Sequence, residues 1–306
     1  MVESIGLIER AAALLRQRES AQLAPAPPLD EVGAAASETA DHIGGSRLVL
    51  DRGQLAAFGV AIPSAERSRT AEEFRLVKRN LIATWASDLR GGDDRLGRVI
   101  MVTSARPGEG KTFVALNLAL AFSSEREVKA LLVDADTHVD TRHSALKTIL
   151  GDRQTKGIVD VLAGAATLDE ALIHTNIENL FVLAAGHGGP HVPELFSSPR
   201  MNSLLNEMTR RFPDRFIILD TPPCMVSSDA ATMAALVGQV VFVIEAHRTQ
   251  QDEIEASLSM LSACPRISLL LNKSEQVNAH FGSYGYDYGY PSVKGDELRR
   301  DKPAPA

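Results

Sequence analysis

The sequence predicts an α/β fold with a doubly wound, mainly parallel sheet, of the class that carries a phosphate-binding loop. Three observations lead to this prediction. Short apolar runs of strand length alternate with segments of helical length, as is typical of parallel strands that are covered by helices on both faces. A glycine-rich loop that ends in Gly-Lys-Thr follows one of these runs, and two later runs end in aspartate.

The composition of the 306-residue chain fits one large domain with appendages. Hydrophobic residues make up 44% of the chain, enough for a sizeable core, and no apolar run reaches membrane-spanning length. Acidic residues interrupt the N-terminus, which excludes a signal peptide, so we expect a cytoplasmic protein. Cys224 and Cys264 form neither a disulfide framework nor a metal-binding spacing. The net charge of −7 argues against nucleic acid as a partner.

The first 65 residues precede the alternating pattern. Residues 1–22 are expected to form an amphipathic helix, which packs either on its own domain or on a partner or membrane surface. Residues 23–65 are expected to be a linker and docking segment. The linker is rich in proline and alanine, and the apolar cluster in residues 47–63 is expected to fold back onto another surface.

The main domain is expected to span residues 66–278 and to open with a helix over Thr70–Thr84. Charged residues recur every three positions on one face of this helix, and their spacing alone favours an ordinary solvated face. They are Glu72, Arg75 and Lys78.

Six apolar runs are the expected strands of the sheet. Segments of helical length separate them, and no solenoid-type repeat is present. The expected strands are Arg98–Thr103, Lys129–Asp134, Leu180–Ala184, Phe216–Asp220, Val240–Glu245 and Ile267–Leu271.

The loop after the first of these strands has the layout of a phosphate-binding loop, although Ala105 stands where the usual pattern has its first glycine. Glycines let the backbone curl so that successive N–H groups point at phosphate oxygens, and the helix that follows adds its positive dipole end. Lys111 supplies a charge for the phosphates, and the Thr112 hydroxyl is a ligand for Mg²⁺. The expected nucleotide-binding residues here are Ala105, Arg106, Pro107, Gly108, Glu109, Gly110, Lys111, Thr112 and Phe113.

Two strand ends carry the acids that are expected to meet this loop. One run ends in Asp134-Ala-Asp136, and another ends in Asp220 followed by Thr-Pro-Pro. Ligands of open α/β sheets bind beyond the carboxyl ends of the strands, so these groups should converge. Such acids hold Mg²⁺ directly or through water, which leaves one of them free to accept a proton from an attacking hydroxyl.

These motifs together resemble the bacterial tyrosine kinases, which belong to the deviant-Walker class that includes division-site and plasmid-partition ATPases. The loop SARPGEGKT is similar to the form that these kinases carry, and EEFRLVKRNL resembles their oligomerisation helix, with Lys78 in place of an expected arginine. The segments ESIGLIERAAALL, LVGQVVFVIEA and LLLNK more narrowly resemble tyrosine autokinases of exosortase-linked exopolysaccharide loci. The resemblance covers nearly the whole chain, apart from the linker.

The resemblance implies roles for particular residues. ATP and Mg²⁺ are the implied cofactors, bound by Lys111 and Thr112. Asp134 is the implied base for the tyrosine hydroxyl. Asp136 and Asp220 help to hold the metal, and Asn272 contacts the nucleotide base. The chain departs from the family at Thr137-His138, where a basic residue is usual, and this puts in question how the nucleotide or subunit contact is made there.

The resemblance also implies partners. The family acts as homo-oligomers, in some cases rings, and Glu72, Arg75 and Lys78 are the implied subunit contacts. The implied activator is a separate membrane protein, a polysaccharide co-polymerase or chain-length protein, which would hold the kinase peripherally at the inner membrane. A tyrosine phosphatase is the implied antagonist.

All four tyrosines of the chain lie within seven residues, in SYGYDYGYP. Glycine and proline between them disfavour helix and strand, so residues 279–306 are expected to be a flexible tail. A kinase-like site elsewhere makes these side chains the expected phosphoacceptors rather than a low-complexity aromatic tail. They are Tyr284, Tyr286, Tyr288 and Tyr290.

The main expectation is thus an ATP-dependent tyrosine autokinase that regulates exopolysaccharide polymerisation or export. The alternative is a partition- or placement-type ATPase, in which the bound nucleotide drives dimerisation and surface binding. Those ATPases normally carry lysine where this loop has Arg106, and they lack a tyrosine tail. Eukaryotic-type kinase chemistry is excluded because neither the H-R-D nor the D-F-G signature occurs.

Overall fold

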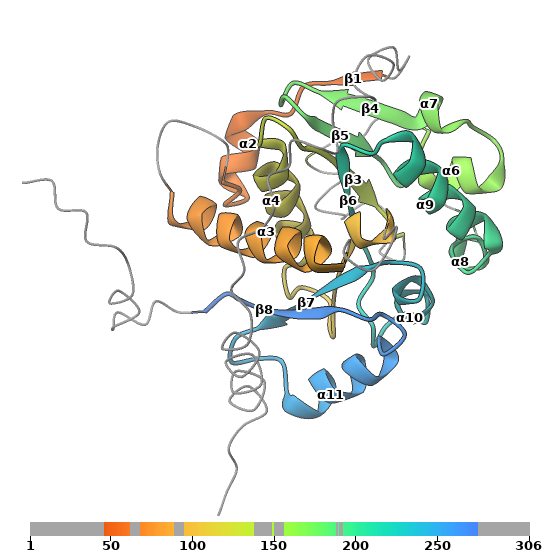
Figure 1. Cartoon of the computed structure of the whole chain (residues 1–306). Coiled ribbons are helices and arrows are strands. Elements are labelled where there is room, and N and C mark those ends of the chain that lie inside the picture. The colour runs from red at the N-terminus through yellow and green to blue at the C-terminus, as the bar shows by residue number, and fades with distance from the viewer. Residues whose placement is uncertain are drawn as a thin grey trace, which may run out of the picture. The chain divides into compact units, whose positions relative to one another are not determined.

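The structure, a computed structural model, describes residues 46–61, 68–88, 95–137, 149, 156–187, 189 and 192–274. The expected N-terminal helix, the linker as far as residue 45 and the tyrosine cluster lie outside the described residues. An eight-stranded sheet forms the centre of the described chain, in the order β1-β4-β5-β3-β6-β2-β7-β8 (Figure 1). Neighbouring strands are parallel except β4 and β5. The predicted doubly wound, mainly parallel sheet is confirmed.

The six expected strands all occur, with bounds that differ from the predicted ones by a residue at most. Two further strands, β1 and β4, were not predicted. The strands are β1 Ser46–Leu48, β2 Val99–Ser104, β3 Lys129–Asp134, β4 Leu172–Thr175, β5 Leu180–Leu183, β6 Arg215–Asp220, β7 Gln239–Glu245 and β8 Ile267–Asn272.

Helices cover both faces of this sheet. On one face lie α2 Arg52–Ala57, α3 Arg69–Asp88 and α4 Lys111–Ser123. On the other lie α6 Ile158–Ala163, α7 Leu168–Ala171, α8 Val192–Phe196, α9 Pro199–Arg211, α10 Asp229–Ala234 and α11 Gln251–Met260. A short 3-10 helix, η3 Arg95–Arg98, leads into β2.

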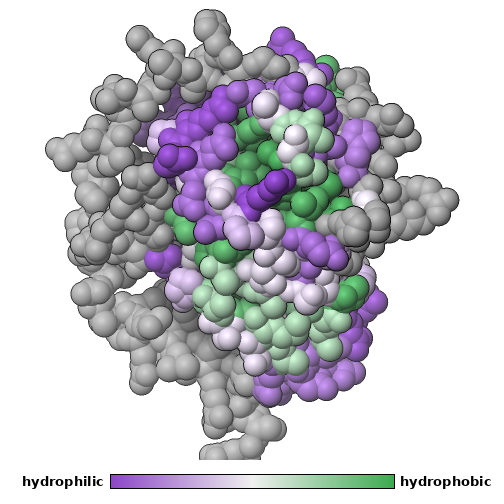
Figure 2. All heavy atoms as spheres, turned by 90° about the vertical axis from the view of Figure 1, so that its right-hand side faces the viewer, coloured by the Kyte–Doolittle hydropathy of each residue, from purple (hydrophilic) through white to green (hydrophobic). Residues whose placement is uncertain are grey.

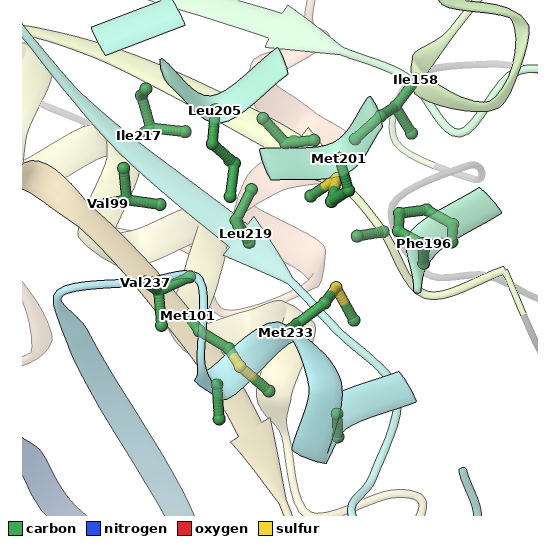
Figure 3. Packing of buried hydrophobic residues seen from close by; sticks show 14 of the residues in the cluster. Val99, Met101, Ile158, Phe196, Met201, Leu205, Ile217, Leu219, Met233 and Val237 are labelled. Carbon is green, nitrogen blue, oxygen red and sulfur yellow. The ribbon is translucent and has the colours of Figure 1, made fainter. Parts of the chain in front are cut away.

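Alternate residues of the central strands point into two separate hydrophobic clusters. Val99 and Met101 of β2 pack with α9 and α10, whereas Ile100 and Val102 of the same strand pack with α3 and α4. Figure 3 shows the first cluster, in which Phe196 and other side chains of the helices lie over the sheet. Because both faces are buried, these strands are continuous apolar runs, and this is why the sequence revealed them.

Residues 46–61 are part of the folded unit. β1 pairs in parallel with β4, and the Leu50 N–H donates a hydrogen bond to Asn176 Oδ1 (2.8 Å). Leu55 is fully buried in the cluster beneath α3 and α4. The expectation that this apolar segment folds back onto another surface is therefore confirmed, and that surface is the chain's own sheet and α4.

We expect Leu55→Ala to lower the free energy of unfolding by about 2–5 kcal/mol, because it removes a fully buried side chain and leaves a cavity. Urea denaturation of the full chain measures this change. Val49→Ala is the matched control, because Val49 is 71% exposed and its truncation should change stability by less than about 0.5 kcal/mol. Equal midpoints for the two variants would show that residues 46–61 contribute nothing to the core.

Figure 2 shows the face that lies on the right of Figure 1, where hydrophobic residues gather near the middle and hydrophilic residues surround them. Among the described residues, none of the helices is both long and apolar enough to cross a membrane.

Candidate active site

The phosphate-binding loop lies between the carboxyl end of β2 and the first residue of α4. Two of its glycines have positive φ, 84° at Gly108 and 100° at Gly110. A Cβ atom at Gly110 would lie 2.1 Å from Asn272 Nδ2, so both the backbone conformation and the close approach require glycine. Gly110 is also the N-cap of α4, which leaves the first N–H groups of this 13-residue helix for an anion.

Lys111 and Asp136 meet beside this loop. Lys111 Nζ lies 3.4 Å from Asp136 Oδ2, and the two side chains are only 8% and 9% exposed. The ammonium group comes from the first residue of α4, and the carboxylate comes from the loop that follows β3. Two expected site residues, 25 positions apart in sequence, are thus an ion pair at one edge of the sheet.

Asp134 and Asp220 end neighbouring strands in the same register, β3 and β6. Both are buried, at 4% and 1% exposure. Asp134 Oδ1 accepts a hydrogen bond of 3.3 Å from the Asp136 N–H. The Lys111 ammonium and the Thr112 hydroxyl are both close enough to Asp220 to lower the pKa of its carboxyl group. The three acids, the lysine and the threonine therefore converge as the strand topology predicts.

Two oxygen atoms in this cluster are buried and have no hydrogen-bond partner within the described chain, Asp136 Oδ1 and Asp220 Oδ1. Buried carboxylate oxygens without partners are costly unless a cation satisfies them. Carboxylate and hydroxyl oxygens suit Mg²⁺, which takes few protein ligands and keeps waters and phosphate oxygens. In the same described residues, no set of three His, Cys, Asp or Glu side chains is close enough to hold a metal alone. Asp136, Asp220 and Thr112 therefore fit a magnesium ion that is shared with a phosphate group.

Burial raises the pKa of Asp220 to about 7 from its usual 3.8, and the Asp136 charge adds to this, although Lys111 and the Thr112 hydroxyl oppose it. Between about pH 4 and 7 the folded metal-free protein holds a proton that the unfolded chain releases. The contribution of this group to stability therefore falls as pH rises through that window. A cation needs the ionised form, so cation binding must release this proton below about pH 7.

We expect the affinity for Mg²⁺, in the presence of nucleotide, to rise about tenfold per pH unit between about pH 5 and 7 and then to level off. Calorimetry in buffers of different ionisation enthalpy measures both the affinity and the proton release. In Asp220→Asn the proton release should disappear. An affinity for Mg²⁺ that does not change over this range would contradict the placement of Asp220 at the metal.

The Glu109 side chain stabilises the phosphate-binding loop through hydrogen bonds, a role that the sequence did not reveal. Its buried carboxylate accepts a hydrogen bond from the Arg106 N–H at 2.8 Å and another from the Thr249 hydroxyl. The Arg106 side chain forms an ion pair with the nearly buried Glu253 of α11. Arg106 and Glu109 therefore tie the loop to the segment after β7. These partners lie about 140 positions away in sequence, and no local pattern indicates them.

The carboxyl end of β8 holds the same loop from the side. Asn272 Nδ2 donates a hydrogen bond to the Glu109 carbonyl (2.9 Å), and Lys273 Nζ donates one to the Gly108 carbonyl (2.7 Å). Lys273 also pairs with Glu245 at 3.2 Å. Asn272 thus contacts the phosphate-binding loop itself, and its expected contact with the nucleotide base stays a prediction. Lys273 and Glu245 are further supporting residues that sequence analysis missed.

Two of the expected residues have surroundings other than those foreseen. The Phe113 ring packs edge-on against Phe74, with centroids 5.8 Å apart, so its side chain belongs to the core on the α3 side and only its backbone is at the helix start. Lys78 is not on a solvated face, and that interpretation of its spacing is wrong. Its side chain is 4% exposed, donates to the Ala121 carbonyl and pairs with Glu125 of the same chain.

The other charged residues of α3 remain at the surface. Glu72 and Arg75 form an ion pair with each other, and both side chains are about half exposed. The described chain therefore leaves these two groups accessible and uses Lys78 to fix α3 against the end of α4.

Comparison with known proteins agrees with this geometry. The AAA domain family model matches residues 97–262. The chain is 29% identical to the tyrosine-protein kinase YwqD of Bacillus subtilis, over 77% of this chain and 94% of that protein. It is 31% identical to the tyrosine-protein kinase CpsD of Streptococcus pneumoniae serotype 4, over 69% of this chain and 91% of that protein.

Solved structures show the same fold. The chimerical protein CapA2B2 superposes with a TM-score of 0.57 at 25% identity, over 73% of this chain and 99% of that one. The kinase domain of the Escherichia coli tyrosine kinase ETK superposes with a TM-score of 0.51 at 23% identity, over 78% of this chain and 98% of that one. The phosphate-binding loop, the converging acids and these likenesses together show that the chain belongs to the bacterial tyrosine-protein kinase family.

Proposed function

We propose that this chain is an ATP-dependent protein-tyrosine autokinase that phosphorylates its own C-terminal tyrosine cluster and thereby regulates exopolysaccharide polymerisation or export. One observation carries the proposal. Lys111, Asp136 and Asp220 converge on a phosphate-binding loop, in a chain whose four tyrosines all lie within seven residues.

Each residue of the site has its own role in phosphoryl transfer. The amides of the loop and of the α4 start bind phosphate oxygens, and Lys111 neutralises their charge. Mg²⁺, held by Thr112, Asp136 and Asp220, supplies further positive charge when bound. Asp134 is buried beside Asp220. We assign Asp134 as the base that accepts the proton of the tyrosine hydroxyl. We assign Asn272, which donates a hydrogen bond to the Glu109 carbonyl, to the contact with the nucleotide base.

The acceptors are the tail tyrosines. Each phosphate adds about −1.5 to −2 charge at neutral pH. The unmodified tail is close to neutral, so full modification makes it strongly anionic in a protein whose net charge is already −7. Repulsion between modified tails then favours dispersed over assembled subunits.

Replacement of Tyr284, Tyr286, Tyr288 and Tyr290 by phenylalanine tests the proposal. The variant, which has no tyrosine left, should incorporate no phosphate at all when the full chain is incubated with ATP and Mg²⁺, yet should bind ATP as the wild type does. Mass spectrometry and calorimetry measure the two properties. Phosphate on residues outside the cluster, or loss of ATP binding in the variant, would each contradict the proposed role of the tail.

The same proposal includes an assembly at the membrane. Subunits of a homo-oligomer, of the ring type that the family resemblance implies, would meet through the exposed Glu72 and Arg75. Loss of assembly in Glu72→Ala, measured by light scattering, tests this contact.

A membrane polysaccharide co-polymerase would hold the cytoplasmic kinase at the inner membrane and activate it, and a tyrosine phosphatase would remove the phosphates from the tail. Because residues 46–61 are built into the core, the docking element is assigned to residues 1–45. Capture of the co-polymerase by a chain lacking residues 1–45 would reject that assignment.

A further inference from the structure

The turn after β6 presents two neighbouring apolar side chains to solvent. Met225 is 50% exposed and Val226 is 56% exposed, whereas the residues that lead to them from Asp220 are buried. The other large apolar side chains that are similarly exposed in the described chain lie on other elements, and none of them follows a strand that ends in a site acid. They are Val49, Phe58, Leu76, Met260, Leu269 and Leu271.

The backbone of this turn is fixed to the start of the phosphate-binding loop. The Cys224 N–H donates to the Ser104 carbonyl at 2.8 Å, and the Met225 N–H donates to the Ala105 carbonyl at 3.3 Å. The Thr103 hydroxyl donates to the Pro222 carbonyl at 2.8 Å. A rigid turn therefore holds the apolar pair at the rim of the loop, within six residues of Asp220. The pair therefore lies next to the first residues of the loop that is proposed to bind the phosphates.

The chemistry of the acceptor fits such a surface. A tyrosine must bring its hydroxyl to the acids, while its ring, which is apolar, gains by leaving water. The thioether of methionine makes favourable contacts with aromatic rings. A serine or threonine acceptor has no ring to cover these side chains, so an apolar pair at this position discriminates in favour of tyrosine.

The described chain ends beside the loop. Asn272 and Lys273 are bonded to Glu109 and Gly108. The tyrosines follow 10 to 16 residues after Ser274, a span of at most about 36 to 58 Å. This reach allows a tyrosine of the same copy or of a second copy to approach the loop. In the proposed homo-oligomer, the tail of a neighbouring copy supplies the acceptor.

We propose that Met225 and Val226 form a platform for the phenol ring of the acceptor tyrosine, supplied by a second copy of this chain. The inference rests on the proposed function and deepens it, because it names the residues that recognise the acceptor. Met225 and Val226 bind the ring and take no part in holding the nucleotide.

A two-copy assay tests the platform. The acceptor is the full chain with Lys111→Met, and the donor is the full chain with the four tail tyrosines changed to phenylalanine. Adding Met225→Ser and Val226→Ser to the donor should raise the KM for the acceptor about tenfold or more, as loss of a buried apolar contact does. The KM for ATP and the kcat at saturating acceptor should stay the same, and Met225→Leu should restore the KM for the acceptor.

Met260→Ser in the donor is the matched control, because Met260 is 39% exposed at the far end of α11, and it should change neither KM. An unchanged KM for the acceptor in the double variant would overturn the platform, and so would an equal rise in the KM for ATP. A donor that modifies only its own copy when it keeps its tyrosines would overturn the second-copy assignment. A wild-type chain that forms no phosphotyrosine would instead overturn the proposed function, so the two failures are distinguishable.

Discussion

Lys111→Met should lower the rate of tyrosine phosphorylation by at least about 100-fold, the loss that follows removal of one preorganised charge from a transition state. The ammonium group is 8% exposed and lies 3.4 Å from Asp136, so no water or neighbouring cation can replace it easily. Methionine keeps the length and the apolar stem of the side chain. The rate is measured with the full chain, by transfer of labelled γ-phosphate.

Lys129→Met is the matched control for this change. Lys129 is the first residue of β3, at the opposite edge of the sheet, and pairs with Asp214 at 3.2 Å. The same substitution there should leave the rate within about twofold of the wild type, because the pair is partly exposed and far from the loop. Full activity in Lys111→Met would remove the phosphate-binding loop from the mechanism.

Asp134→Asn should lower kcat by about 10²–10⁴-fold while leaving the affinity for ATP nearly unchanged, because the amide cannot accept a proton from the tyrosine hydroxyl. The side chain is 4% exposed, and its backbone lies in register with Asp220. In contrast to Asp134→Asn, the variants Asp136→Asn and Asp220→Asn should make the rate and the ATP affinity depend less on the Mg²⁺ concentration. Single-turnover rates and ATP affinities at several Mg²⁺ concentrations separate these roles.

Asp214→Asn supplies the control for the aspartate series. Asp214 lies at the amino end of β6, and its ion-pair partners are Lys129 and Arg215 rather than any site residue. The variant should keep the rate and the Mg²⁺ dependence of the wild type. If Asp134→Asn proved as active as Asp214→Asn, the assignment of Asp134 as the base would be wrong.

The fold could be predicted from the sequence where strands are buried on both faces. β2, β3, β6 and β7 are continuous apolar runs because helices cover each side of the sheet. β1 and β4 escaped prediction for the opposite reason. They are three and four residues long, and β1 finds its partner strand more than 120 positions away, so neither length nor periodicity indicates them.

The convergence of the site acids could be predicted from the strand topology. Asp134 and Asp220 are the last residues of their strands and Asp136 follows shortly after Asp134, and the carboxyl ends of parallel strands meet at one edge of the sheet. The supporting contacts were not predictable, because Glu109 meets Thr249, and Lys78 meets Glu125, only after the chain has folded. The spacing of charges on α3 is the same for Lys78 as for Arg75, although the end of α4 covers Lys78 and Arg75 lies at the surface.

The fate of the γ-phosphate of ATP tests the central claim most directly. The full chain is incubated with Mg²⁺ and γ-labelled ATP in a single turnover, and the label is divided between inorganic phosphate and each residue of the chain. We predict label on one or more of Tyr284, Tyr286, Tyr288 and Tyr290, formed at the rate at which ATP is consumed. Release of all the label as inorganic phosphate, with none on tyrosine, would contradict the account and favour a partition-type ATPase.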